Sequence, residues 1–389
     1  MSMTTTLADH QLLTGNHAVA WGARLARPQV IPVYPITPQS PIMEKLGDFH
    51  AAGEIDAEIL TPESEHSAMA AAIAASLAGV RVFTATASQG MLLMHELLHY
   101  AAGGRAPIVM FNVNRTVASP WAFWPDATDS LSQRDTGWIQ IYSETPQESL
   151  DSTIQAFRVA EAVSLPTMVC HDAFYVSHAM EPVIVPDQTL VDGYLPPYAP
   201  EHFVEPGRGE SFGYVIDQAT FNQTRRDLDQ AMARVPGVLE EADAAWRDLT
   251  GRGYGLVESY RLDDADTAII TMGSMAGTAR VAVDELRDAG QRVGLLKVRL
   301  FRPFPMVAVR AALAGIGRAV VLDRNYSPGV GGMLHQELKS ALFGLNGSAP
   351  QVHGLLAGVG GVNVTPAKIC QFVADTTDRD PQPQSIWVE

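Results

Sequence analysis

The sequence predicts an α/β protein made of two parallel-sheet units joined by a connector. Strand-like apolar runs alternate with helical segments over residues 1–180, and the same alternation returns over residues 263–389. Such alternation is typical of a parallel sheet covered by helices on both faces. Between the units, residues 181–262 are rich in proline and acidic residues and predict an extended connector without strands, followed by a long charged helix over 217–251.

Composition narrows the class of protein. The 389 residues are 47% hydrophobic, with a net charge of −16 and a pI near 5.1, which suits a globular protein and disfavours nucleic acid or an anionic membrane as a partner. No apolar stretch reaches the roughly 18 residues of a membrane span, and residues 1–11 carry no signal region, so we expect a cytoplasmic protein. Cys170 and Cys370 lie in apolar runs and are interpreted as small buried hydrophobes, too few to hold an iron–sulfur cluster.

Polar residues follow the predicted strands of the first unit. A helix over 15–27 carries a stripe of small residues suited to close packing on a sheet, and the strand 30–34 after it ends in a turn that displays Thr37. A simple helix N-cap is the alternative interpretation of Thr37. A later strand within 107–115 is apolar until its end, where Arg115 follows. Arg115 is either a bidentate clamp for a carboxylate or a solvated loop charge.

The stretch 61–90 organises the first unit. It contains a loop with three ionisable residues, an alanine-rich helix, a buried strand and a tight turn, namely Glu63, Glu65 and His66, then 67–79, 82–85 and Ser88-Gln89-Gly90. A carboxylate at the mouth of a strand-to-helix turn lies where open α/β sheets bind their ligands. We therefore predict that Glu65 acts on a cofactor, whereas its neighbours Glu63 and His66 are assigned no role.

Two further segments, a tryptophan-rich loop and a glycine-rich turn, have compositions that suggest irregular structure. Residues 116–138 are rich in Trp, Pro, Asp and Ser and show little periodicity, so we interpret them as a functional loop or a packed lid. In the second unit, Gly329, Gly331 and Gly332 do not fit the GxGxxG dinucleotide pattern and are interpreted as tight turns.

Five motifs carry a resemblance to a known family. In chain order they are YPITPQSP (34–41), ESEHSAMAAAIAASLAG (63–79), ATASQG (85–90), NVNR (112–115) and RDTGW (134–138). With this order and spacing the chain resembles the α subunit of the 2-oxoacid:ferredoxin oxidoreductases, the pyruvate:ferredoxin oxidoreductase family, over nearly its whole length. The resemblance implies a pyrimidine-binding thiamine diphosphate domain over 1–180, a connector with a long helix over 181–262, and a domain similar to the transketolase C-terminal domain over 263–389.

The family implies a cofactor site shared between chains. The α subunit resembles the half that binds the pyrimidine of thiamine diphosphate, while the diphosphate and its Mg²⁺ bind a β subunit through a GDG motif, which this chain lacks. Coenzyme A is implied as co-substrate, and [4Fe–4S] clusters are implied on other subunits and not on this chain. The implied partners are a β subunit, a ferredoxin-like iron–sulfur subunit and a γ-type subunit, and a flavin or NAD electron-transfer subunit stays open.

The resemblance also implies roles for single residues. By its place in the motif, Glu65 is the catalytic carboxyl that hydrogen-bonds N1′ of the aminopyrimidine and so promotes loss of the thiazolium C2 proton. Thr37 matches a residue that binds the oxo-acid end of the substrate, and Arg115 matches the arginine that binds its carboxylate. Ser88 and Gln89 are expected to contact the cofactor, and no metal ligand is expected on this chain.

Two departures from the family pattern bear on the substrate. Gln39 stands where the pyruvate enzymes usually have Ser, and residues 124–127 (Trp-Pro-Asp-Ala) stand where pyruvate-type chains often carry an Asn-Asp-His run. Loss of an imidazole with gain of Trp121, Phe123 and Trp124 suits a larger, aromatic 2-oxo acid such as phenylglyoxylate. Packing of these rings within the protein, and pyruvate as the substrate, are the alternatives.

We therefore expect an oxidoreductase subunit whose complex decarboxylates a 2-oxo acid to its acyl-CoA and passes electrons to clusters on partner subunits. A non-catalytic assembly subunit and a non-oxidative thiamine diphosphate enzyme are the competing hypotheses. The sequence of this chain does not determine which 2-oxo acid is used or whether ferredoxin or NAD is the final electron acceptor. It also does not determine the stoichiometry of the complex or the physiological direction of the reaction.

Overall fold

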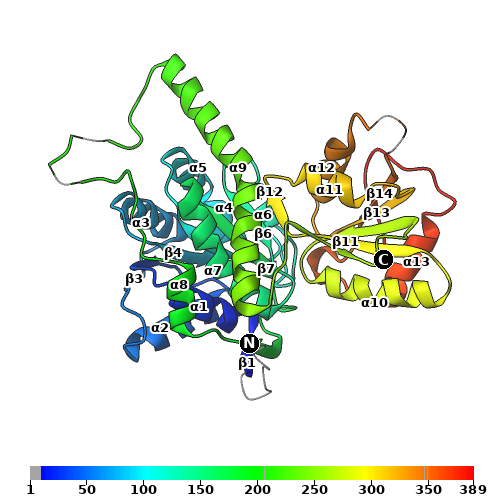
Figure 1. Cartoon of the computed structure of the whole chain (residues 1–389), viewed down its shortest axis with the longest axis horizontal. Coiled ribbons are helices and arrows are strands. Elements are labelled where there is room, and N and C mark those ends of the chain that lie inside the picture. The colour runs from blue at the N-terminus through cyan, green and yellow to red at the C-terminus, as the bar shows by residue number, and fades with distance from the viewer. Residues whose placement is uncertain (1–9, 206, 210, 346, 348) are drawn as a thin grey trace.

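The computed structural model describes residues 10–205, 207–209, 211–345, 347 and 349–389. Two α/β bodies lie side by side, and the long helix α9 (Gln218–Thr250) runs along the first and projects beyond it (Figure 1). Most of residues 1–11, for which the sequence predicts no signal region, lie outside the described residues. No helix in the described part of the chain combines the length and the apolar character that a bilayer crossing demands.

The first body is organised by a five-stranded sheet in the order β12-β6-β7-β5-β4. Its strands are β4 (Phe83–Thr86), β5 (Val109–Asn114), β6 (Ile139–Tyr142), β7 (Thr167–Asp172) and β12 (Leu300–Arg302). The first four pair in parallel and are buried throughout, as the apolar runs predict. The edge strand β12 runs antiparallel to β6 and comes from the second half of the chain, which the sequence does not predict.

Two short sheets, β2-β3 and β1-β8, accompany the larger one. Their strands are β1 (His10–Thr14), β2 (Val30–Pro32), β3 (Glu58–Leu60) and β8 (Met180–Ile184). The first pair is parallel, and a bridge between Val30 and Val82 carries it to the edge of the five-stranded sheet. The prediction of no strands in 181–262 is wrong, because β8 pairs with the start of the chain and β9 (Val257–Tyr260) pairs with the second sheet.

Helices cover both faces of the first sheet. They are α1 (Gly15–Leu25), α2 (Ser40–Ala51), α3 (Glu65–Leu77), α4 (Ser88–Leu93), α5 (His95–Gly103), α6 (Thr128–Leu131), α7 (Pro146–Val163) and α8 (Gln188–Tyr194). Met110 packs with residues of α3 and α5, whereas its neighbour Phe111 packs with residues of α1 and α7. The small residues of α1 are expected to lie on a sheet, but Gly22 lies against α7, where a Cβ would come within 2.7 Å of the Leu150 carbonyl oxygen. They serve a close approach of two helices.

The second body contains a six-stranded sheet in the order β15-β14-β13-β10-β11-β9. Its further elements are β10 (Thr267–Thr271), α10 (Met275–Asp288), β11 (Val293–Val298), α11 (Met306–Ala312), β13 (Arg318–Asp323), α12 (Met333–Leu342), β14 (Gln351–Leu356), the 3-10 helix η2 (Val359–Gly361), α13 (Pro366–Asp375) and β15 (Ile386–Trp387). All neighbours pair in parallel except the edge strand β9. Gly329 and Gly331 have positive φ angles, as tight turns require, whereas Gly332 leaves room for the Asp323 carboxyl group.

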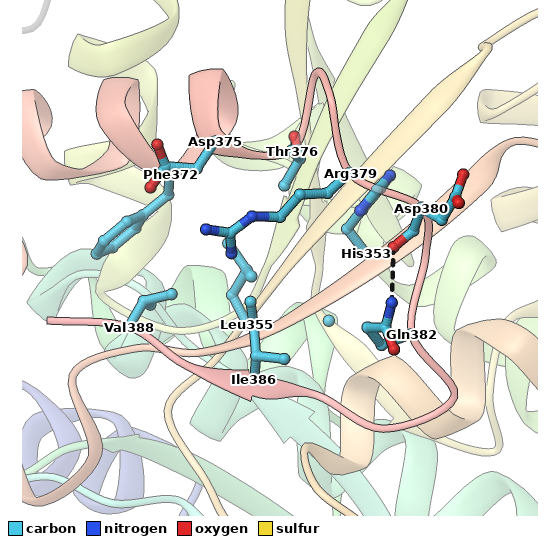
Figure 2. Close-up of a pocket in the computed structure, with 11 residues that line it drawn as sticks. His353, Leu355, Phe372, Asp375, Thr376, Arg379, Asp380, Gln382, Ile386 and Val388 are labelled. Atoms are coloured by element: carbon cyan, nitrogen blue, oxygen red, sulfur yellow. Dashed lines mark hydrogen bonds between the residues drawn. The ribbon is translucent and has the colours of Figure 1, made fainter.

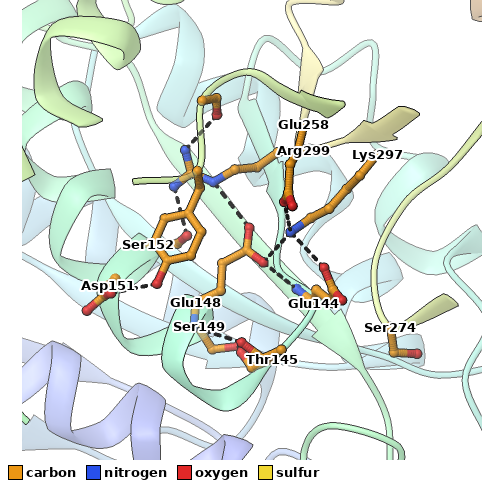
Figure 3. A network of polar contacts seen from close by, with 12 residues as sticks. Glu144, Thr145, Glu148, Ser149, Asp151, Ser152, Glu258, Ser274, Lys297 and Arg299 are labelled. Atoms are coloured by element: carbon orange, nitrogen blue, oxygen red, sulfur yellow. Dashed lines mark hydrogen bonds and ion pairs between the residues drawn. The ribbon is translucent and has the colours of Figure 1, made fainter. Parts of the chain in front are cut away.

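A buried ion cluster, made of Glu144, Glu148, Lys297 and Arg299, joins the two bodies (Figure 3). The Lys297 Nζ lies 2.6 Å from Glu148 Oε2 and 2.9 Å from Glu144 Oε2. The Arg299 Nε lies 3.4 Å from Glu148 Oε1. Buried charges are tolerated when they are paired and hydrogen-bonded, so the cluster fixes the second sheet against the start of α7.

The two cysteines differ in their surroundings. Cys170 on β7 is fully buried, as expected, and burial raises the pKa of its thiol well above the ordinary value. Cys370 on α13 is half-buried, with its Sγ 3.7 Å from the Ala282 carbonyl oxygen. The prediction of a buried cysteine is therefore confirmed for Cys170 and only partly confirmed for Cys370.

Candidate active site

The prediction that Glu65 lies in a loop is wrong, because Glu65 is the first residue of helix α3. Ser64 caps the helix, and its Oγ accepts a hydrogen bond from the Ser67 N–H at 3.2 Å. The Glu65 side chain is buried, with 7% exposure, and no other residue among those described donates a hydrogen bond to its carboxyl group. Buried polar groups normally have partners, so this carboxyl group is available to a ligand.

Gly90 allows helix α4 to approach this carboxyl group. A Cβ at Gly90 would lie 2.6 Å from Glu65 Oε1 and 2.5 Å from Thr86 Oγ1. Ordinary van der Waals contacts of a Cβ begin near 3.4 Å. Gly90 has an ordinary φ angle, so its backbone conformation does not require glycine. Glycine is required here because a larger side chain would collide with Glu65.

Arg115 follows strand β5 and forms hydrogen bonds to residues that follow β2 and β4. Its Nη1 donates to the Thr37 carbonyl oxygen, and its Nη2 donates to Gln89 Oε1 at 2.5 Å. The side chain is 5% exposed, so the alternative of a solvated loop charge is wrong. Burial lowers the pKa of Arg115, an effect that the nearby carboxyl groups of Asp129 and Glu65 oppose. The guanidinium therefore lies within electrostatic reach of Glu65.

Thr37 is exposed, and only its carbonyl oxygen is used by Arg115. The N-cap of α2 is Gln39, so the alternative of Thr37 as a cap is wrong. The two neighbours of Glu65 that received no role have other partners. Glu63 accepts a hydrogen bond from Ser67, and His66 lies 3.8 Å from Glu96 at the surface.

Ser88 begins helix α4 with a backbone φ of 48°, a left-handed conformation that a residue other than glycine rarely adopts. Its Oγ lies 2.6 Å from Gln89 Oε1 and 2.5 Å from the Thr116 carbonyl oxygen. The hydroxyl group is buried and already bonded within the chain. Ser88 therefore shapes the turn that presents Gln89 to Arg115.

Asp129 is a site residue that sequence reasoning misses. It lies on the four-residue helix α6, is fully buried, and accepts hydrogen bonds from the backbone N–H groups of Ser88 and Arg115. Burial raises the pKa of Asp129 to about 7, although these hydrogen bonds act in the opposite direction. Three aspartates occur in the loop 116–138, and nothing in their local sequence distinguishes this one.

Several buried polar atoms at the same strand ends have no partner among the described residues. They are Thr86 Oγ1, Gln89 Nε2, Asn112 Oδ1 and Arg115 Nε. Thr86 and Asn112 face each other across β4 and β5, and the other two residues follow these strands. Such unmet capacity suits a polar, anionic or heteroaromatic ligand. Within the described residues no three His, Cys, Asp or Glu side chains gather as a metal site.

The aromatic residues of the loop 116–138 have partners inside the protein. Trp121 and Phe123 pack edge to face with ring centroids 5.0 Å apart, and the Arg115 guanidinium lies 5.0 Å from the Trp121 ring. Trp124 lies 5.4 Å from the Phe174 ring and against Gly361 of the second body. The rings therefore support the arginine and the junction of the two bodies, although each keeps about half its surface exposed.

A separate hollow lies in the second body, between β14, α13 and the last strand (Figure 2). It is lined by Leu355, Phe372, Ile386 and their neighbours, and its volume is about 30 Å³. This is room for little more than water, so the hollow does not compete with the strand ends of the first body as a substrate site.

Comparison with known families agrees with this geometry. The family described as pyruvate flavodoxin/ferredoxin oxidoreductase, thiamine diphosphate-binding, matches residues 21–244, and pyruvate:ferredoxin oxidoreductase core domain II matches residues 265–369. The chain belongs to the 2-oxoacid:ferredoxin oxidoreductase family, as an α subunit. The fold class is thereby confirmed, with a thiamine diphosphate-binding domain followed by core domain II, and the chain is a subunit of an oxidoreductase of this family.

Relatives of this α subunit resemble it over almost the whole chain. Pyruvate synthase subunit PorA of Methanothermobacter thermautotrophicus is 45% identical over 380 residues, 97% of either chain. Ketoisovalerate oxidoreductase subunit VorA of Pyrococcus abyssi is 44% identical over 367 residues, 94% of this chain and 93% of that one. Neither name supports the phenylglyoxylate branch of the family.

The fold also matches a solved structure. A 2-oxoglutarate:ferredoxin oxidoreductase from Magnetococcus marinus, described with 2-oxoglutarate, coenzyme A and succinyl-CoA bound, superimposes with a TM-score of 0.72 at 20% identity. The match covers 94% of this chain but only 65% of that one. At this identity the likeness supports the fold alone.

Proposed function

We propose that this chain supplies the pyrimidine-binding half of a thiamine diphosphate site in a complex that oxidises a short aliphatic 2-oxo acid to its acyl-CoA. The observation that carries the proposal is the buried Glu65 carboxyl group, which has no donor among the described residues and lies against Gly90. Such a carboxyl group is suited to a hydrogen bond with a ring nitrogen of the cofactor.

Glu65 is the proposed catalytic residue. Thiamine diphosphate, when bound, supplies the carbon nucleophile and accepts the electron pair that decarboxylation releases. Glu65 holds and returns a proton at the N1′ position of the pyrimidine. Gly90 fixes its distance from α4.

Arg115 and Thr37 form the proposed substrate-binding part of the site. Two of the guanidinium nitrogens of Arg115 bond to the chain, and its Nε has no partner among the described residues, so a carboxylate is a suitable ligand. Thr37 is an exposed residue, and its hydroxyl group is proposed to contact the oxo-acid end. Gln89, through its unpartnered Nε2, is proposed to contact the cofactor, and Ser88 to act through the turn that it shapes.

A short substrate replaces the aromatic one in this proposal. Pyruvate and ketoisovalerate stand in the names of the relatives at 45% and 44% identity. In addition, Trp121 and Phe123 are engaged with each other and with Arg115, which leaves them as a wall of the site rather than as an open aromatic slot. Phenylglyoxylate remains the alternative that the experiment below includes.

The half-site requires partners. The relatives are named as subunits, which supports a complex of several chains. Its proposed other members are a β subunit that binds the diphosphate and Mg²⁺, a γ-type subunit and a ferredoxin-like subunit that carries the [4Fe–4S] clusters. Coenzyme A is the proposed co-substrate. We retain the division of the chain into 1–180, 181–262 and 263–389 as a proposal, with the short strands β9 and β12 reaching across its boundaries.

The test is dye-linked oxidation of 2-oxo acids by the complex purified through this subunit, with coenzyme A present. We expect turnover of pyruvate or ketoisovalerate well above that of phenylglyoxylate. Glu65→Gln should lower kcat by about 10²-fold or more, whereas the exposed neighbour variant Glu63→Gln should leave it unchanged.

Other outcomes would contradict the proposal in different ways. Normal turnover in Glu65→Gln would favour the non-catalytic assembly subunit. Preferred turnover of phenylglyoxylate would restore the aromatic substrate. Consumption of a 2-oxo acid without electron transfer to the dye would indicate a non-oxidative thiamine diphosphate enzyme.

A further inference from the structure

The carboxyl group of Asp129 connects the two elements that build the candidate site. Its Oδ2 accepts hydrogen bonds from Ser88 N at 2.8 Å, Arg115 N at 3.2 Å and Asn112 Nδ2 at 3.1 Å. Its Oδ1 accepts from Ser130 N at 2.7 Å. One buried oxygen therefore joins the start of α4 to the end of β5. Both N–H groups belong to backbone that directly precedes or carries a proposed site side chain.

Ser88 explains why this position needs a strong acceptor. Its left-handed backbone conformation, at φ 48°, is unfavourable for a residue with a Cβ and persists only where the surroundings hold it. A hydrogen bond from a backbone N–H to an ionised oxygen is stronger than one to a neutral acceptor. The hydrogen bond from Ser88 N to Asp129 therefore stabilises the turn. The conformation of the turn determines where Gln89 and Gly90 lie.

We propose that Asp129 is a positioning residue that keeps the Ser88-Gln89-Gly90 turn and Arg115 in the arrangement that binds the 2-oxo acid. The inference rests on the proposed function. Asp129 itself touches neither substrate nor cofactor, because its side chain is fully buried beneath the backbone of both segments. Its effect passes through the place of Arg115, whose Nη1 and Nη2 bond to Thr37 and Gln89.

The ionised form of Asp129 is the one that these neighbours fit. All four partners are N–H donors, so a protonated carboxyl group, or the amide of an asparagine, would direct a hydrogen toward another donor. Burial raises its pKa to about 7. The titratable groups that face it are Tyr142 on β6 and Cys170 on β7, whose pKa values are both raised by burial, and the Arg115 cation. Among these groups only Asp129 changes its charge near neutral pH.

The experiment compares Asp129→Asn with Asp323→Asn in the complete complex. Asp323 is a matched control, because it is also fully buried and accepts hydrogen bonds from the N–H groups of Leu334 and His335 at 3.0 Å, but in the second body. At pH 8 we expect Asp129→Asn to raise the KM for the 2-oxo acid by about 10- to 100-fold while the KM for coenzyme A stays within twofold. The control should change neither constant by more than twofold.

The pH profile gives a second, independent readout. In the parent complex kcat/KM for the 2-oxo acid should fall as the pH drops through about 7, because Asp129 takes up a proton and the turn loosens. This acidic limb should be absent in Asp129→Asn and present in Asp323→Asn. A loss of stability alone would move neither the KM ratio nor the limb.

A third readout needs neither activity nor a variant that folds. Amide hydrogen exchange of the parent complex, corrected for the intrinsic pH dependence, should show the peptides containing Ser88 and Arg115 losing protection between about pH 8 and pH 6. Constant protection over this range would overturn the proposal, as would an Asp129→Asn complex whose KM values and pH profile match those of Asp323→Asn. If the parent complex oxidises no 2-oxo acid, the proposed function fails, and the exchange measurement still decides whether Asp129 holds the turn.

Discussion

Replacement of Gly90 by alanine is the sharpest perturbation of the candidate site. The new Cβ would lie 2.6 Å from Glu65 Oε1 and 2.8 Å from Glu65 Cγ, so the carboxyl group must retreat by about 0.8 Å to reach an ordinary contact. A misplacement near 1 Å of a group at a reaction centre costs about 10²-fold in rate. We therefore expect Gly90→Ala to lower kcat by about 100-fold in the dye-linked assay. The thiamine diphosphate retained by the purified complex should also decrease.

The fold should survive this change. Alanine is better than glycine inside a helix by about 0.5–1 kcal/mol, which offsets part of the roughly 1–3 kcal/mol that overpacking costs. Gly47→Ala is the matched control, because it lies within α2 and its Cβ would meet nothing within 4 Å. It should keep full activity. A Gly90→Ala complex with parental kcat and parental cofactor content would refute the assignment of Glu65 as the cofactor contact.

Three further predictions concern the arginine, the ion cluster and acid stability. Arg115→Lys keeps the charge but loses the planar fork, so the KM for the 2-oxo acid should rise about 10- to 100-fold, and an unchanged KM would exclude a carboxylate clamp. Lys297→Met removes the cation nearest to two buried carboxylates and should cost about 3–5 kcal/mol in urea unfolding, whereas Arg292→Met at an exposed pair should cost less than about 1 kcal/mol; equal costs would contradict a stabilising ion cluster. Burial lowers the pKa of His171 to about 3, so its contribution to stability is complete above the unfolded value of 6.5 and is lost as the pH falls toward 3. The urea midpoint should therefore drop less between pH 7 and pH 5 in His171→Gln than in the parent.

Much of the first body follows from local sequence. A buried parallel strand is a short apolar run, and the residue after it lies at the edge where α/β folds bind ligands. That rule and the motif resemblance together predict Glu65 and Arg115 as candidate site residues, and the structure brings both to one edge of the first body with Thr37 and Gln89.

Other features depend on partners that are distant in the sequence. β8, β9 and β12 are short and have no local signature, and each becomes a strand only because an edge elsewhere in the fold offers its hydrogen bonds. The small residues of α1 fit either a sheet or a helix, and only packing decides for α7. Trp124 likewise suits a substrate pocket by composition, but its place against Gly361 of the second body is set by how the two bodies meet.

The sequence by itself determined the α/β class, the family and the main polar residues, because strand periodicity and short motifs are local properties of the chain. The tertiary structure alone decided that Asp129, one of three similar aspartates in an irregular loop, lies beneath both Ser88 and Arg115. Burial is a property of the whole fold, and it is burial that makes this one carboxyl group a strong, titratable acceptor near neutral pH.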